Sequence, residues 1–165
     1  MRAHSLLYAL LPGTLACTGS TPSPAPQSAA ADVAGAEGVV RALYQTYLRD
    51  APRPDLWTSG TLSKGLQGAW DQADKAPTPP PGFDVISAAQ DDHLTDFLLE
   101  TTATPTGARV VAHFKNFGAP TEVDWALIRE GGAWKIDDVV SGGQDLRATL
   151  AGAAPDRRDD DLGSG

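Results

Sequence analysis

Five side chains between residues 90 and 140 could take up a proton as a general base: His93, His113, Asp124, Asp137 and Asp138. A carboxyl group in an apolar pocket has a raised pKa, which is the property that such a base requires. Asp138 fits this role best, because strand alternation puts it on one face with Trp134 and Ile136. The spacing fixes no acid beside a base, however, and a carboxylate near a strand end commonly caps a turn. We therefore expect no catalytic residues.

Metal ligands are equally sparse. The three histidines, His4, His93 and His113, lie far apart, and Asp91-Asp92-His93 is the nearest approach to a ligand cluster. A solvated loop explains that run better. The glycines form no phosphate-binding loop, and no Gly-x-Ser-x-Gly sequence is present. We expect no metal and no cofactor.

Cys17, the only cysteine, follows a basic start and an apolar stretch at residues 6–11. That stretch is much shorter than the ~20 residues that span a bilayer, so residues 1–16 are predicted to be a secretory signal. The segment resembles the signals of bacterial lipoproteins. The resemblance implies that Cys17 carries a diacylglycerol, that the signal is cut before it, and that the new amine is acylated, for example with palmitate. The alternative is a plain secretory signal that leaves Cys17 as a free thiol.

By the same resemblance, Thr18 stands where an Asp would retain a lipoprotein in the inner membrane. We therefore expect the outer membrane, with the protein facing the periplasm. A lone cysteine excludes an internal disulfide, so an apolar core must stabilise the fold. The net charge of −8 and the pI near 4.6 argue against nucleic acid as a partner and favour a basic one.

Composition divides the chain into four segments. Residues 1–16 are the signal, and residues 17–32, rich in Pro, Ser and Ala, are predicted to be a linker. Residues 33–150 hold every Trp and Phe and should form one domain. Residues 151–165, with a charged run and a terminal Gly-Ser-Gly, are predicted to be a disordered acidic tail.

Within the domain, hydrophobic periodicity predicts helices at residues 36–48 and 61–73, capped by Asp32 and by Ser59 or Thr61. From there the period changes to two. About four antiparallel strands are expected, with turns at residues 105–107, 118–120 and 131–132, and a short closing helix from Gln144. The predicted architecture is α+β, with helices covering one face of the sheet.

Several short motifs carry a resemblance to a family. They are a helix with Tyr44 and Tyr47-Leu48, a helix start at Leu62-Ser63, a Gln90-Asp91 step, the hairpin into residues 134–139, and a closing Leu146-Arg147 with Leu150. Together these resemble domain-of-unknown-function family 3828, which occurs in bacterial envelope proteins. The resemblance implies a cystatin-like, nuclear-transport-factor-2-like cone, in which a curved sheet wraps a helix around a cavity. The chain departs from the family pattern in its proline-rich insert at residues 77–81.

Six aromatic side chains and Asp138 would either line such a cavity or belong to the ordinary core: Tyr44, Tyr47, Trp70, Phe114, Trp125 and Trp134. We expect a membrane-anchored, non-catalytic binding or accessory module of the envelope, with a protein partner. The resemblance also leaves open a small-ligand-binding protein, or an isomerase- or dehydratase-like enzyme with an inward Asp or His. A periplasmic immunity protein that neutralises a toxin is a further alternative.

Overall fold

Three helices and a five-stranded antiparallel sheet make up the described part of the chain. The structure is a computed structural model, and it describes residues 27–49, 51–53, 55–76 and 84–153. The elements in chain order are α1 (Gln27–Leu48), α2 (Lys64–Ala73), β1 (Leu94–Thr104), β2 (Gly107–Asn116), β3 (Ala119–Glu130), β4 (Ala133–Ser141), β5 (Gln144–Asp145) and α3 (Leu146–Ala153). The strands follow one another across the sheet in sequence order. The predicted α+β arrangement is confirmed.

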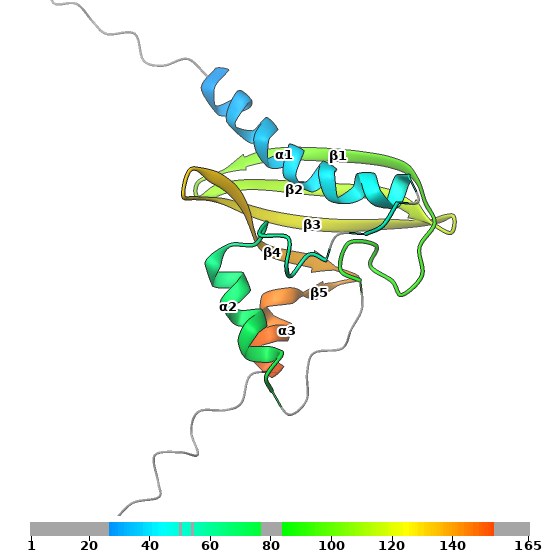
Figure 1. Cartoon of the computed structure of the whole chain (residues 1–165). Coiled ribbons are helices and arrows are strands. Elements are labelled where there is room, and N and C mark those ends of the chain that lie inside the picture. The colour runs from blue at the N-terminus through cyan, green and yellow to red at the C-terminus, as the bar shows by residue number, and fades with distance from the viewer. Residues whose placement is uncertain (1–26, 50, 54, 77–83, 154–165) are drawn as a thin grey trace, which may run out of the picture.

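Helix α1 lies across one face of the sheet, where it contacts β1, β2 and β4 (Figure 1). Its buried side chains recur at helical spacing: Ala36, Val40, Leu43, Tyr44 and Tyr47. The helix ends at Leu48, as predicted. It begins at Gln27, inside the segment assigned to the linker, so Asp32 is not its cap. The run Ala29-Ala30-Ala31 explains the earlier start, because alanine has the highest helix propensity.

Helix α2 ends at Ala73, as predicted, but its cap is Ser63 rather than Ser59 or Thr61. The reason is that the chain before Ser63 is still paired with a strand. The N–H of Ser63 donates to the carbonyl of Ile136 at 2.7 Å, and the N–H of Ile136 donates to the carbonyl of Thr61 at 2.9 Å. The Ser63 hydroxyl then accepts the N–H of Leu66 at 3.0 Å.

The hairpin turns between β1 and β2 and between β3 and β4 lie where Gly and Pro predict them. The turn between β2 and β3 lies at Phe117 and Gly118 rather than at residues 118–120, because Ala119 and Pro120 already belong to β3. Strand β1 begins at Leu94 and contains a bulge between Thr95 and Leu98, where Asp96 has a φ of 54°. The Lys115 ammonium lies 2.8 Å from the Asp96 carboxylate. A fifth strand, β5, takes up Gln144 and Asp145, so the closing helix starts later than expected.

A second bulge interrupts β4. Asp138 pairs with Ala126, whereas Ile136 pairs with Leu127, which leaves Asp137 as an extra residue. The inner face of β4 therefore continues at Val139, which is only 1% exposed, and not at Asp138. The expectation that Asp138 shares a face with Trp134 and Ile136 was wrong, because one extra residue moves every later side chain to the opposite face.

Strand β4, which contains this second bulge, also determines where helices α2 and α3 lie. They pack against each other and against β4, beside the sheet rather than across it (Figure 1). Their buried residues, Leu66, Ala73, Leu146 and Leu150, join the same hydrophobic core as α1.

Gly107 provides a test of the sheet geometry. A Cβ atom there would lie 2.0 Å from the carbonyl oxygen of Leu127, so a Gly107→Ala variant must push β2 and β3 apart. We expect its free energy of unfolding in urea to fall by about 1–3 kcal/mol, the usual cost of overpacking. Gly38→Ala is the control: a Cβ at Gly38 meets nothing within 4 Å, and removing a helical glycine should add about 1 kcal/mol. Equal stabilities of the two variants would contradict the register described for β2 and β3.

Candidate functional site

The sheet face opposite α1, hereafter the open face, carries the side chains that point away from the core. Strand register places the following residues on it: Leu98, Glu100, Thr102, Arg109, Val111, His113, Lys115, Glu122, Asp124, Ala126, Ile128, Asp138 and Val140. All except Val111 are exposed or half-buried. Leu98 is 56% exposed and Val140 is 38% exposed, so apolar side chains meet solvent on this face.

Ionisable side chains of neighbouring strands lie close together on the open face. Arg109 lies 2.5 Å from Asp124, from β2 to β3. The imidazole of His113 lies between two carboxylates, 3.7 Å from Glu100 and 3.5 Å from Glu122. These pairs are substantially exposed, so each contributes little to stability. They place charged and polar groups beside the apolar side chains of this face.

A shallow pocket on this face, with a volume of about 310 Å³, brings together three of the candidate carboxylates. Asp124, Asp137 and Asp138 all line it, beside Arg109. Apolar and hydroxyl side chains complete the rim, among them Thr104, Thr106, Ala126, Ile128 and Val140. Of the two candidate histidines, neither His93 nor His113 lines this pocket.

Both adjacent carboxylates of the bulge have structural partners. Asp137 accepts a hydrogen bond from the Ser63 hydroxyl at 2.6 Å and from Arg147 Nη2 at 2.5 Å. Asp138 Oδ1 accepts the N–H of Val139 at 2.8 Å and that of Arg147, in the first turn of α3, at 3.1 Å. Burial raises the pKa of Asp138, and the two backbone N–H donors oppose that shift. Asp138 thus caps the start of α3.

The six candidate aromatic side chains lie in different parts of the structure. Tyr44 is at the centre of one cluster, in ring contact with Tyr47, Phe97, Phe114 and Trp125. Trp125 Nε1 donates to the Tyr44 hydroxyl at 3.3 Å, and burial raises the pKa of Tyr44. These rings are buried between α1 and the sheet and pack against one another, as an ordinary core does.

The other two candidate tryptophans, Trp134 and Trp70, lie outside that cluster. Trp134 packs against α1 near Gly35, where a Cβ would come within 2.9 Å of its ring. Trp70 on α2 is half-buried and stacks on Trp57, with ring centroids 3.6 Å apart and planes at 5°. The six aromatic side chains therefore do not line one common space.

A polar cluster at the C-terminal end of α1 was not expected from the sequence. The Tyr47 hydroxyl donates to Asp84 at 2.6 Å, and the Arg53 guanidinium lies 4.6 Å from the centre of the Tyr47 ring. Arg53 also pairs with Asp92 at 2.6 Å. The Asp92 side chain is only 6% exposed, so this carboxylate serves an ion pair rather than the solvated loop that was expected. Because the residues of each pair are far apart in the sequence, no local sequence pattern predicts their contact.

No group of three or more potential metal ligands gathers among residues 27–49, 51–53, 55–76 and 84–153. In those same ranges, no helix has both the length and the apolar character needed to cross a membrane. Cys17, the signal, most of the linker, the proline-rich insert and most of the tail lie outside the described residues. The predictions made for them stay predictions.

The sequence matches no protein-family model, no curated protein and no solved structure. Function must therefore be argued from the residues and their geometry. What that geometry offers is an exposed, partly apolar sheet face whose central carboxylates are engaged in holding the fold together.

Asp138 yields a test based on pH. Because its pKa is raised in the folded state, its ionisation destabilises the fold, and this penalty is absent below its unfolded pKa and complete above its folded pKa. An Asp138→Asn variant keeps an oxygen acceptor for the two N–H groups. Its stability relative to the unchanged protein should therefore rise as the pH increases from 3 to 7 in a series of urea titrations.

Asp71→Asn, which removes an exposed carboxylate on α2, is the control for the loss of one negative charge. A relative stability of Asp138→Asn that falls with increasing pH would show that the ionised carboxylate is favoured by its surroundings, contrary to the buried position described.

Proposed function

We propose that this protein is a lipid-anchored binding module of the bacterial cell envelope, without catalytic activity, and that the open face of the sheet is its surface for a protein partner. The observation that carries the proposal is the exposure of Leu98 and Val140 amid rows of paired charges on that face. Large apolar side chains surrounded by polar ones are typical of protein interfaces.

Binding is favoured over catalysis by the state of the candidate carboxylates. Asp137 and Asp138 are held by Ser63, Arg147 and backbone N–H groups, which leaves neither poised to exchange a proton with a substrate. Asp124 is paired with Arg109. These paired carboxylates stabilise the surface of the sheet and give it a defined pattern of charge.

The charge of the chain indicates the kind of partner. The net charge is −8, and Glu100, Glu122, Asp124 and Asp138 contribute acidic groups to the open face. A basic protein would be drawn to such a surface by long-range attraction, which increases the rate of association. We therefore propose a basic envelope protein as the partner.

We further propose that the fold is a cone of the cystatin-like, nuclear-transport-factor-2-like kind, as the resemblance to family 3828 implies. Helix α1 on one face of a meandering sheet supports this proposal. So does the position of the aromatic cluster around Tyr44 between them. Location in the outer membrane, facing the periplasm, is proposed from Cys17 and Thr18.

The partner surface can be tested with two matched variants. Leu98→Lys removes an exposed apolar group from the open face and adds a charge that repels a basic partner. Leu48→Lys makes the same change at the end of α1, where Leu48 is 42% exposed. In affinity capture from detergent-solubilised membranes, Leu98→Lys should recover about tenfold less partner, a loss of about 1.4 kcal/mol. Equal recovery with both variants would exclude the open face.

The anchor is tested separately. A Cys17→Ser variant should lose its acyl mass in mass spectrometry and move from the membrane fraction to the soluble fraction, because several acyl chains are needed for stable attachment. A Thr18→Ser variant, which keeps the cysteine, should remain in the membrane fraction. Unchanged membrane association of Cys17→Ser would refute the lipoprotein proposal and leave the open-face proposal untouched.

A further inference from the structure

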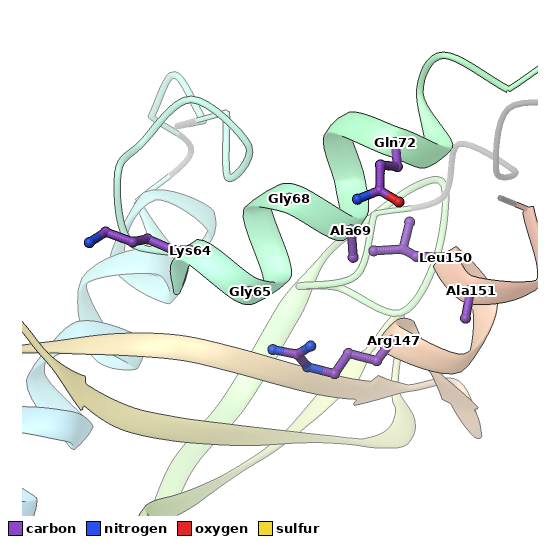
Figure 2. A pocket seen from close by; sticks show the side chains of 8 residues that line it. All are labelled: Lys64, Gly65, Gly68, Ala69, Gln72, Arg147, Leu150 and Ala151. Atoms are coloured by element: carbon purple, nitrogen blue, oxygen red, sulfur yellow. The ribbon is translucent and has the colours of Figure 1, made fainter.

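A groove lies between helices α2 and α3, and none of its lining residues belongs to the open face. It has a volume of about 660 Å³ and is lined by Lys64, Gly65, Gly68, Ala69, Gln72, Arg147, Leu150 and Ala151. Figure 2 shows the two helices facing each other across it, with Ala69 and Gln72 of α2 directed toward Leu150 of α3. Volumes of this size are typical of sites for small molecules.

The middle of the groove is apolar and unobstructed. A Cβ atom at Gly68 would meet nothing within 4 Å, so space is free where a side chain would normally stand. Leu150 is buried and provides an aliphatic floor beside Ala69. An extended hydrocarbon chain fits these surroundings, because burying each methylene contributes about 0.8 kcal/mol.

One end of the groove is cationic. Arg147 extends beneath the first turn of α2, and its Nη2 lies 3.1 Å from where a Cβ on Gly65 would stand (Figure 2). Its Nε and Nη2 donate to Asp137, whereas Nη1 makes no hydrogen bond with any described residue. Lys64 is the first residue of α2 at this end, but its side chain points away from Arg147 and from the groove (Figure 2).

The lining thus holds two cations and no carboxylate, in a chain of net charge −8. Two acidic groups beside these residues already have partners: Asp137 accepts a hydrogen bond from Arg147, and Glu130 accepts one from the backbone N–H of Lys64. An acceptor with a negative charge is the complement of this end, since charge-assisted hydrogen bonds to guanidinium are the stronger kind.

We propose that the groove between α2 and α3 binds an aliphatic carboxylate, with the carboxylate at the Arg147 end and the hydrocarbon chain over Gly68, Ala69 and Leu150. The site is separate from the open face, so it does not depend on the partner proposed there. An aliphatic carboxylate is the class of ligand that matches an apolar groove with a positively charged end.

Octanoate is a suitable probe, followed by chemical shifts in ¹H–¹⁵N spectra of the labelled full chain. We expect saturable shifts at the amides of Gly65, Gly68 and Ala151. Acetate, which has the same head and no chain, should bind at least tenfold more weakly. Similar shifts with acetate, or octanoate shifts that avoid α2 and α3, would overturn the proposal.

One pair of variants and a second probe complete the test. Gly68→Leu fills the groove and should abolish the octanoate shifts, whereas Gly38→Leu, another helical glycine with nothing within 4 Å of its Cβ position, should preserve them. Both replace glycine in a helix and should fold at least as well as the unchanged chain. Octanol, which has the hydrocarbon chain without the negative charge, should bind severalfold more weakly than octanoate, because it cannot form a charge-assisted hydrogen bond with Arg147.

Binding that survives Gly68→Leu overturns the proposal. So does a groove occupied by a second copy of the chain, which would appear as shifts at Gly65 and Gly68 that depend on protein concentration without octanoate.

Discussion

The carboxylate of Asp137 is the contact on which the arrangement of the other elements depends. It accepts hydrogen bonds from Ser63, the cap of α2, and from Arg147 in α3, so one side chain connects β4 with both helices. It can do so because Asp137 is the extra residue of the β4 bulge. The same bulge turns Val139 into the core and Asp138 out to the open face. The helix pair, the groove and the open face therefore share one origin.

Much of the fold could be predicted from local patterns. Gly131-Gly132 fixes a hairpin, the spacing from Ala36 to Tyr47 fixes the buried stripe of α1, and the alternation of Val123, Trp125 and Leu127 fixes a buried strand face. Each of these signals lies within about a dozen residues and needs no knowledge of the neighbours. The bulge has no such signal, because Trp134, Ile136 and Asp138 continue a period of two. Only the pairing with Ala126 and Leu127 reveals it.

The candidate site was predictable in part. Asp124, Asp137 and Asp138 were identified from residue type and do lie together around one pocket. Their roles were not predictable, because the partners that hold them come from elsewhere in the chain: Ser63 from the cap of α2 and Arg147 from α3. Arg53, which pairs with Asp92, escaped attention for the same reason. Residue type indicates which groups can react, whereas long-range contacts decide which are free to do so.

Strand β1 forms one edge of the sheet, and its bulge affects how this edge can pair with another copy of the protein. A flat edge strand invites a neighbouring molecule to add its own strand, which is a route to aggregation. The positive φ of Asp96 breaks the straight run of backbone donors and acceptors, and its carboxylate and that of Glu100 place charge on this strand. At high local concentration, this interrupted edge would therefore pair with a strand of a second copy less readily than a straight edge strand would.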